Sequence, residues 1–298
     1  MKKLKVIMID GFKPEYLKYA PYLSSLTKFL QWGKLEMPMG HWRGVQVLFE
    51  GYSDIISVFY KSDNSSLKFV KRLRWLENFG ESGRFIVDSL INLNRLIQRK
   101  ELFRTGKIPL DILDEFEISI NRHFSKKPGI KFYCFGDLDS LAHKHGTKSP
   151  EIIKAIKRID KKISKMKFDF IFSDHGMCDI QKIISVPEAR KCFIDGDMAR
   201  YWGDKKELEQ IKSRLPLKFG KIIKWDEKYG ELIFLVDSGV LIYPNFWDKK
   251  GPAKAMHGYD GKSEDMKAVY ILNKKGNKKD LDAYQLHKIL KNQFNEVL

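Results

Sequence analysis

The sequence predicts an α/β fold in which a central, mostly parallel β-sheet is sandwiched between helices, with a small cap or inserted region. Three observations support this fold class. Short apolar runs of strand length recur at Leu4–Ile9, Lys131–Phe135 and Phe168–Phe172. Segments with the apolar spacing of helices lie between them, and strands that alternate with helices are typical of parallel sheets. A length of 298 residues and an apolar content of 43% suffice for one large packed domain.

The first part of the chain is predicted to form a strand and then a helix. Leu4–Ile9 has the composition of a buried strand and leads into Asp10 and Gly11. Pro21 fits the first turn of a helix, because an N–H group at that position would have no partner within the helix. The apolar face of this helix is predicted to consist of Leu23, Leu26, Phe29 and Leu30.

The middle of the chain is predicted to form a β-α-β unit. Its helix follows Ser149, which fits the N-cap, begins with Pro150 and continues through Ile163. In parallel sheets, ligand sites form beyond the carboxyl ends of the strands. We therefore expect the acids that come at or beyond the ends of the three predicted strands to meet at one rim. These acids are Asp10, Asp139 and Asp174.

Residues 1–298 are predicted to form a single domain that carries two inserts. The first, at about 61–129, is basic and helical, and the second, at about 180–252, is a mixed cap or edge region. The first insert is expected to hold an amphipathic basic helix that could rest on a membrane, shield the mouth of a site or pack on the protein's own core. Its apolar face would be formed by Ile86, Leu90, Leu93 and Ile97.

The remaining elements are predicted from shorter patterns. The second insert is expected to contain a helix over 205–215 and apolar runs over 232–236 and 240–243. Residues 267–272 are predicted to form a closing strand, and a terminal helix is expected from residue 281 onward.

The formal charge of +17, from 55 basic and 38 acidic residues, favours anionic partners. An anionic phosphorylated substrate is the main expectation, peripheral contact with an anionic membrane is a further one, and a generally lysine-rich composition is the alternative explanation. Nucleic acid is not expected as a partner, because basic and aromatic residues do not gather in a recognisable module. The sequence indicates no particular oligomeric state.

Targeting signals are not recognisable in this sequence. No stretch approaches the roughly 18 consecutive apolar residues of a membrane-spanning helix, and the first residues lack the apolar region of a signal peptide. We therefore expect a cytoplasmic location. Three cysteines without Cys-x-x-Cys spacing indicate neither a disulfide framework nor a thiolate zinc site.

Four short segments carry aspartates and histidines that suit divalent metals. Each segment also has an ordinary explanation, since Asp-Gly commonly forms turns and Asp-x-x-x-His can be a surface pair on a helix. Together they fit two zinc-like ions, because imidazole and carboxylate oxygen are both suitable ligands. Two such ions can stabilise the attacking and leaving oxygens of a displacement at phosphorus. The segments are Asp10-Gly11, Asp139-x-x-x-His143, Ser173-Asp174-His175-Gly176 and Met256-His257-Gly258-Tyr259.

These ordered motifs resemble those of the alkaline phosphatase superfamily, in its branch of type I phosphodiesterases and nucleotide pyrophosphatases. The resemblance implies an alkaline phosphatase-like fold and two divalent metal ions, most commonly zinc, with manganese or another divalent ion as alternatives. It further implies two ligand sets. One consists of Asp139, His143 and His257, and the other of Asp10, Asp174 and His175.

The resemblance also implies a Thr or Ser nucleophile, or a Cys-derived one in sulfatases, at a helix N-terminus beside the metals. Here the sequence departs from the family, because His41 occupies that position when counted back from the Gly-x-Tyr-type turn at Gly51. His41 could attack phosphorus, orient a metal-bound water or occupy a metal site. Arg43 could contact a phosphate or lie on the surface, and Gly44 stands where many relatives carry a phosphate-contacting Asn.

The sequence as a whole predicts a two-metal-dependent phosphohydrolase or phosphodiesterase that acts on a phosphorylated small molecule or nucleotide. Sulfatase and phosphoglycerate mutase activities fit less well, since each needs a hydroxyl or thiol, and no Ser, Thr or Cys lies between Thr27 and Ser53. The alternative is a catalytically impaired or inactive metal-binding relative that binds an anionic ligand or partner.

Overall fold

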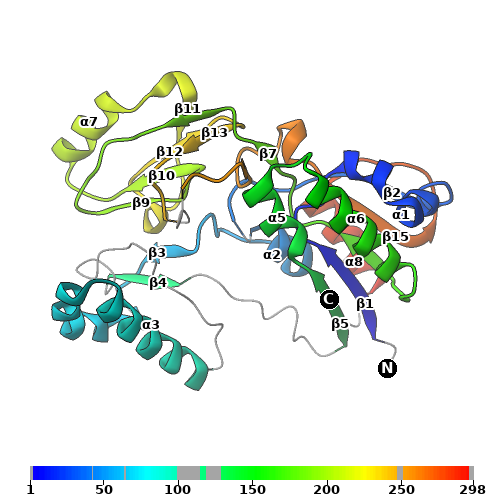
Figure 1. Ribbon diagram of the computed structural model, residues 1–298, viewed down its shortest axis with the longest axis horizontal. Coiled ribbons are helices and arrows are strands. Elements are labelled where there is room, and N and C mark those ends of the chain that lie inside the picture. The colour runs from blue at the N-terminus through cyan, green and yellow to red at the C-terminus, as the bar shows by residue number, and fades with distance from the viewer. Residues whose placement is uncertain are drawn as a thin grey trace.

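The structure is a computed structural model that describes residues 3–41, 43–63, 65–98, 115–118, 129–246 and 251–294. Within these ranges, a six-stranded sheet with strand order β16-β2-β15-β6-β1-β5 forms the centre of the fold (Figure 1). Every strand of this sheet except β15 runs in one direction, which confirms the predicted, mostly parallel sheet. The strands are β1 (Leu4–Ile9), β2 (Leu30–Glu36), β5 (Ile130–Phe135), β6 (Phe170–Phe172), β15 (Ala268–Lys275) and β16 (Leu281–Asp282).

Helices cover both faces of the central sheet. Successive side chains of a strand point to opposite faces, so Ile7 and Ile9 belong to one apolar core and Val6 and Met8 to another. The predicted sandwich is therefore confirmed. The first core is closed by α1 (Pro21–Leu26), α5 (Asp137–His145) and α6 (Pro150–Ile163), and the second by α2 (Arg43–Glu50) and α8 (Ala283–Gln293).

The helix of the β-α-β unit forms as predicted, whereas the first helix is shorter than expected. Ser149 Oγ accepts a hydrogen bond from the N–H of Ile152 at 3.3 Å, and α6 begins at Pro150. The prediction that Phe29 and Leu30 continue the face of α1 is wrong. Phe29 is exposed and Leu30 begins β2, because backbone pairing of β2 with β15 outweighs a helical spacing of only two turns.

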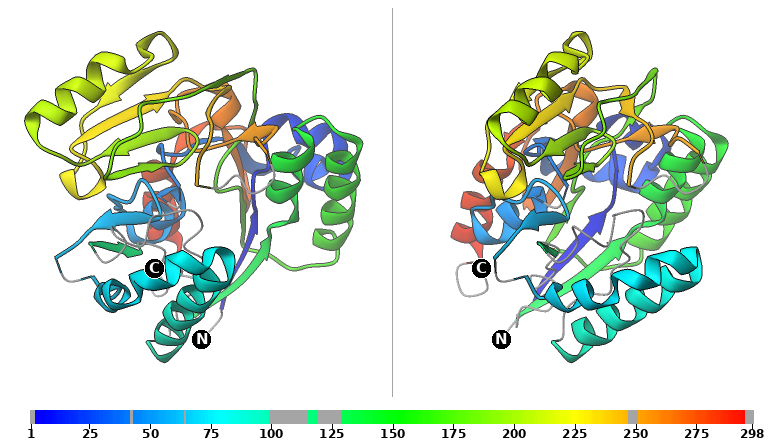
Figure 2. Two further views of the ribbon diagram at one scale, coloured as in Figure 1. Left: turned by 60° about the vertical axis from the view of Figure 1, so that its left-hand side comes forward. Right: turned by 90° about the vertical axis from the view of Figure 1, so that its left-hand side faces the viewer.

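A second sheet, with strand order β11-β12-β10-β9, lies beyond the carboxyl end of β1 and carries α7 (Lys205–Arg214) on its outer side (Figure 2). We call this sheet the cap sheet. Its residues fall within the predicted insert at 180–252, although the domain boundaries themselves stay a prediction. The strands are β9 (Cys192–Ile194), β10 (Met198–Tyr201), β11 (Gly220–Ile223) and β12 (Leu232–Val236).

Besides these two sheets, the described residues form three two-stranded pairings. The first pairs β7 (Cys178–Asp179) with β14 (Ala255–Met256), and the second pairs β8 (Lys182–Ile184) with β13 (Val240–Ile242). The third pairs β3 (Phe59–Lys61) with β4 (Phe116–Ile118). Short 3-10 helices complete the described chain at Pro14–Tyr19, Lys68–Phe79, Leu217–Phe219, Glu227–Tyr229 and Glu264–Met266.

The basic insert contains the predicted helix, α3 (Gly80–Ile97), but its apolar face is not the buried one. The side of α3 that packs on the protein carries Val87 and Ile91 together with the buried guanidinium-bearing Arg95. The interpretation of the other side as a core face is therefore wrong. Residues 99–107 of the basic first insert lie outside the described residues. The exposed apolar side chains are Ile86, Leu90, Leu93 and Ile97, with Phe85 and Leu96 beside them.

Two further observations concern the end of the chain and membranes. Residue 281 belongs to β16 rather than to the terminal helix, which begins two residues later as α8. Of the helices that the structure describes, none is long and apolar enough to cross a membrane.

Candidate metal centre

Three adjacent strands of the central sheet each deliver an aspartate to the same rim. Asp10 directly follows β1, and a single residue separates Asp174 from the end of β6. Asp139 lies in the first turn of α5, which begins two residues after β5 ends. Gly11 adopts a φ of 70°, and its N–H donates to Asp174 Oδ1 at 3.2 Å. The rim predicted from the strand ends thus holds all three acids.

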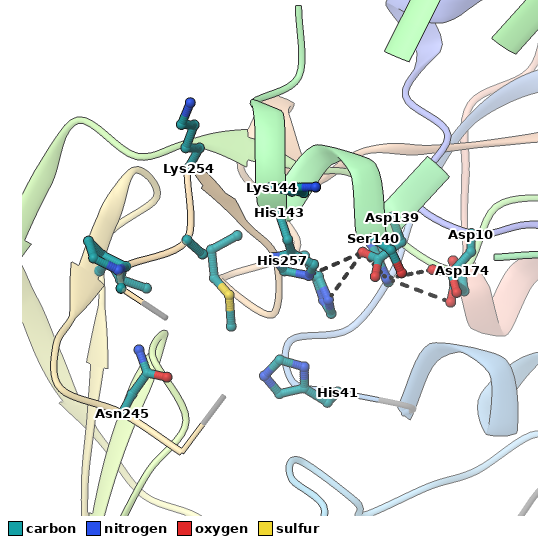
Figure 3. Close-up of a pocket in the computed structure, with 16 residues that line it drawn as sticks. Asp10, His41, Asp139, Ser140, His143, Lys144, Asp174, Asn245, Lys254 and His257 are labelled. Carbon is teal, nitrogen blue, oxygen red and sulfur yellow. Dashed lines mark ion pairs between the residues drawn. The ribbon is translucent and has the colours of Figure 1, made fainter. Parts of the chain in front are cut away.

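Six side chains from four distant segments meet at this rim (Figure 3). Asp139 Oδ1 is the centre of one part, at 3.3 Å from His143 Nε2 and 3.6 Å from His257 Nε2. His175 Nε2 is the centre of the other, at 3.2 Å from Asp10 Oδ1 and 3.6 Å from Asp174 Oδ2. Among the described residues, two groups of three residues each offer candidate ligand atoms, and the atoms within each group all lie within 4.8 Å of one another. They are Asp139, His175 and His257, and Asp10, Asp174 and His175.

The geometry groups the residues slightly differently from the sets that the resemblance implies. His175 lies between the two parts, because its Nε2 is also 4.0 Å from Asp139 Oδ1. His143 approaches Asp139 one helical turn away on α5. All six predicted ligands are nevertheless in one place, and their binding of metal stays a prediction.

Two of the histidines are oriented by backbone carbonyls. The Nδ1–H of His143 can donate to the carbonyl of Ala255 at 2.7 Å, and that of His175 to the carbonyl of Gly176 at 2.8 Å. A proton held on Nδ1 leaves the lone pair on Nε2, which is the atom that faces the aspartates. The imidazoles are therefore arranged as metal ligands usually are.

The protonation of the cluster also favours a bound cation. Burial, together with the nearby charge of Asp10, raises the pKa of Asp174 to about 7. Burial alone would lower the pKa of His175, but the carboxylates of Asp174 and Asp10 raise it to about 10. Burial and the neighbouring His175 hold the pKa of His257 well below its ordinary value, so His257 is neutral. In the absence of metal, bound protons partly neutralise the negative charge of the carboxylates. A divalent ion would supply that positive charge instead.

Whether the cluster of aspartates and histidines fits a metal ion can be judged from a buried carboxylate oxygen that lacks a hydrogen-bond partner. Asp139 Oδ1 is buried and has no hydrogen-bond partner among the described residues, although three imidazole nitrogens lie within 4.0 Å of it. Leaving such an oxygen without a partner costs about 1–3 kcal/mol. A cation bound between this carboxylate and the imidazoles would remove that cost, so the residues fit divalent ions.

A cavity of about 750 Å³ opens beside the cluster. The six candidate ligands line one side of it, and Lys144, Lys254 and Asn245 line other parts (Figure 3). The two lysines bring positive charge to a cavity whose apolar walls include Leu241 and Met256. The cavity therefore suits an anionic ligand with an apolar portion.

His41 lies beside the candidate metal centre, at the position that the sequence assigns to the nucleophile. Its side chain is buried, and its ring centroid is 4.9 Å from that of His257. Its backbone N–H donates to the carbonyl of Ile56 at 3.1 Å, and its Nε2 lies 3.1 Å from Asp197 Oδ1. Burial would lower the pKa of His41, but Asp197 raises it above its ordinary value.

Arg43 lies in the first turn of α2 but does not line the cavity. Its Nε–H donates to the carbonyl of Ser53 at 2.9 Å, its Nη2 donates to the hydroxyl of Tyr284 at 3.1 Å, and its guanidinium stacks 4.4 Å over the ring of Trp225. These contacts direct the side chain away from the metal centre. Arg43 is thus held by contacts with Ser53, Tyr284 and Trp225, and a phosphate contact by this residue stays a prediction.

The surroundings of Gly44 leave little room for a side chain. A Cβ built on Gly44 would lie 2.8 Å from Met37 Sδ and 3.3 Å from the carbonyl oxygen of Asp174. The polypeptide packs so closely here that an asparagine would not fit without movement of Met37.

Sequence reasoning missed a second buried acidic site that faces His41. Asp195, Gly196 and Asp197 form the turn between β9 and β10, and both acids are completely buried. Two acids around a glycine after an apolar run could have indicated a turn with a specific role. The short strands of the cap region, however, gave no periodicity from which to place it.

Comparisons with known proteins agree with this fold. The sequence profile of the family described as type I phosphodiesterase / nucleotide pyrophosphatase matches residues 85–195. No curated protein matches the chain. A murine ectonucleotide pyrophosphatase / phosphodiesterase 5 structure, an inactive form in complex with AMP, has a TM-score of 0.68 at 15% identity over 99% of this chain and 95% of that one.

Two related structures give similar values. A second murine structure of the same protein has a TM-score of 0.65, and a human one 0.66, each at 15% identity over 99% of this chain and 95% of the other. At this identity the structural matches show a shared fold. The matched profile covers Asp139, His143, Asp174 and His175. The predicted resemblance to the type I phosphodiesterase and nucleotide pyrophosphatase branch of the alkaline phosphatase superfamily is thereby confirmed.

Proposed function

We propose that the protein is a two-metal-dependent phosphohydrolase or phosphodiesterase that acts on a phosphorylated small molecule or nucleotide. The observation that supports this most strongly is the meeting of three aspartates and three histidines, from four distant segments, at the wall of one cavity. The family profile supports a phosphodiesterase-like activity independently of that geometry.

The two ions would be held by the residues of the cluster. Asp139, His143 and His257 would bind one ion, and Asp10 and Asp174 the other, with His175 placed between them. Zinc is the first choice, because imidazole-rich sites without cysteine suit it, and manganese is an alternative. When bound, such ions supply Lewis-acid stabilisation of the oxygens that attack and leave phosphorus.

The protein's own residues would bind the substrate and handle its protons. Lys144 and Lys254 attract the anionic substrate into the cavity and offset its charge. His41 either attacks phosphorus through a ring nitrogen or removes a proton from the attacking water. Burial of His41 keeps bulk water away from this nitrogen.

The second candidate function is an inactive relative that binds metal and an anionic ligand. The observation that favours it is the imidazole of His41 at a position where the family carries a hydroxyl. In that case His41 would occupy a coordination position and block attack on phosphorus.

Turnover of aryl phosphate esters distinguishes the two functions. We expect the zinc- or manganese-loaded protein to hydrolyse bis(p-nitrophenyl) phosphate or p-nitrophenyl phosphate, and the Asp174→Asn variant to lose at least about 100-fold in kcat. A His41→Thr variant is compared in parallel. Turnover that appears only in His41→Thr would support the inactive relative and contradict the proposed activity.

We also propose that the apolar side of α3 contacts an anionic membrane surface. This is supported by the exposed side chains of Phe85, Ile86 and Leu93 and by the net charge of +17, which opposes contact with a second copy of the chain. Lys71 and Arg72 are exposed in the 3-10 helix that precedes α3 and add positive charge to this insert. A cytoplasmic location remains part of this proposal.

Vesicle sedimentation tests the membrane contact. We expect binding to vesicles that contain phosphatidylserine and not to neutral phosphatidylcholine vesicles, and a double Ile86→Glu, Leu93→Glu variant should lose most of it. Ile183, exposed on β8, provides the matched control Ile183→Glu. Equal binding by the double variant, or a concentration-dependent dimer that the double variant abolishes, would contradict the proposal.

A further inference from the structure

The cap sheet places a carboxylate against His41. Asp197 follows the turn between β9 and β10, where Gly196 adopts a φ of 99° and the N–H of Asp195 donates to the carbonyl of Met198 at 2.8 Å. Asp197 is completely buried, and its Oδ1 lies 3.1 Å from His41 Nε2. The two residues are 156 positions apart in sequence, so the pair exists only because the cap sheet folds over the rim.

The neighbouring acid, Asp195, already has a cation of its own. Arg200 Nε donates to Asp195 Oδ2 at 3.0 Å, and Ser57 Oγ lies 2.9 Å from both of the Asp195 oxygens. The Nη1 group of Arg200 donates to the carbonyls of Phe59 and Tyr229. Arg200 is therefore directed to Asp195, and among the described side chains His41 is the hydrogen-bond partner of Asp197.

The backbone around Gly258 is shaped to allow this pair. Gly258 adopts a φ of 96°, and a Cβ there would lie 2.5 Å from Asp197 Oδ2 and 3.0 Å from His41 Nε2. The carbonyl of Gly258 accepts a hydrogen bond from the N–H of Gly40 at 2.9 Å. The absence of a side chain therefore lets the loop that carries His257 approach the pair.

A carboxylate in contact with Nε2 determines which nitrogen of a neutral imidazole keeps the proton. In neutral His41, Nε2–H donates to Asp197 and the lone pair is on Nδ1. The same logic operates in serine hydrolases, where a buried carboxylate fixes the tautomer of the catalytic histidine. The oxygen Asp197 Oδ2 is itself buried without a hydrogen-bond partner among the described residues, so the carboxylate retains capacity to stabilise positive charge.

We propose that Asp197 is a positioning residue that holds His41 with its proton on Nε2 and so directs the Nδ1 lone pair to the substrate phosphorus or to the attacking water. This inference rests on the proposed function. If Nδ1 attacks, a nitrogen–phosphorus bond forms while the bond to the leaving oxygen breaks and that oxygen keeps the electron pair. If water attacks, its oxygen bonds to phosphorus, one of its protons moves to Nδ1, and the bond to the leaving oxygen breaks with the electron pair on that oxygen. In both cases His41 gains a positive charge, which Asp197 stabilises.

The tautomer of His41 can be measured directly by ¹⁵N–¹H correlation of the ring nitrogens in histidine-labelled protein at pH 8.5, with and without added zinc. The His41 signals are assigned by their loss in His41→Gln. We expect a proton on Nε2 only in the wild type, and a redistribution toward Nδ1–H in Asp197→Asn. A wild-type spectrum with the proton on Nδ1, or with protons on both nitrogens, overturns the proposal, and it does so even if Asp197→Asn fails to fold.

Kinetics then test the consequence for the reaction. In Asp197→Asn we expect kcat for bis(p-nitrophenyl) phosphate to fall about 100-fold or more, while KM and zinc content stay close to those of the wild type. Asp260, an exposed acid beside the same loop, provides the control Asp260→Asn, which should leave kcat unchanged. An unchanged kcat in folded, zinc-loaded Asp197→Asn overturns the proposal. Absence of turnover in the wild type, with the Nε2–H tautomer present, instead contradicts the proposed function and supports the pairing.

Discussion

His175 and His257 stack face to face, with 3.6 Å between their ring centroids and 8° between their planes. Two imidazoles this close do not both take up a second proton, because the positive charge of one ring would repel that of the other. The pKa values follow that rule, since the acids raise that of His175 while burial and His175 lower that of His257. Of this stacked pair, His175 is therefore protonated and His257 neutral when metal is absent.

The stability of the metal-free protein should fall as pH rises. The pKa of His175 is raised from 6.5 to about 10, so its contribution is fully present below pH 6.5 and is lost as pH rises toward 10. The pKa of Asp174 is raised from 3.8 to about 7, and because the folded state holds this proton more tightly, stability also falls between pH 4 and 7. Urea unfolding in EDTA at pH 5, 7 and 9 measures the slope.

A variant isolates the contribution of the rim from that of other groups. His175→Gln should remove the part of the fall between pH 7 and 9, and added zinc should stabilise the wild type more at pH 9 than at pH 6 because it displaces protons. A steeper fall in His175→Gln than in the wild type would contradict this assignment.

Asp139 and Asp137 provide a matched pair for metal binding, since both lie in the first turn of α5. Asp139 Oδ1 faces three imidazoles, whereas Asp137 is exposed and paired with Arg158. We expect elemental analysis to find two metal ions per chain in the wild type and in Asp137→Asn, and no more than one in Asp139→Asn. Equal metal content in the two variants would remove Asp139 from the ligand set.

An asparagine introduced at Gly44 should destabilise the protein. The new side chain would begin 2.8 Å from Met37 Sδ, and such overpacking typically costs about 1–3 kcal/mol. In a double-mutant cycle, the penalty of Gly44→Asn should be smaller in a Met37→Ala background, where the sulfur is gone. Urea unfolding of the four proteins measures the coupling, and a penalty that is equal in both backgrounds would place the strain elsewhere.

Two isoleucines on α3 test which side of the helix is packed. Ile91 is completely buried, whereas Ile86 is 45% exposed. Ile91→Ala should lower the free energy of unfolding by about 2–5 kcal/mol, and Ile86→Ala by less than about 0.5 kcal/mol. Equal losses would show that both sides of α3 are covered in solution.

The three acids of the candidate metal centre could be predicted from sequence because each comes at or just beyond the end of an apolar strand of the central sheet. Asp10, Asp139 and Asp174 lie close together because β5 and β6 both pair in parallel with β1, so the carboxyl ends of the three strands are at the same edge of the sheet. His257 could be predicted only through the family resemblance, since the two-residue strand before it has no pattern.

Other features depend on tertiary packing that local patterns do not contain. Asp197 lies between β9 and β10, strands of three and four residues, which are too short to show alternation. The end of α1 was missed because pairing with β15 determines where β2 begins. The apolar spacing on α3 predicted the helix correctly but not its orientation, because spacing identifies an apolar side without saying what covers it.

The short pairing of β7 with β14 has a consequence for how this protein can vary. Ala255 lies opposite Asp179 and Met256 opposite Cys178, so the chain leaves the central fold and returns to it at adjacent points. This stem holds the His175 and His257 rings together whatever is attached above it. An exchange of the whole excursion between these strands would therefore replace Asp197 and part of the cavity wall, while the candidate metal ligands on the central fold stay in register.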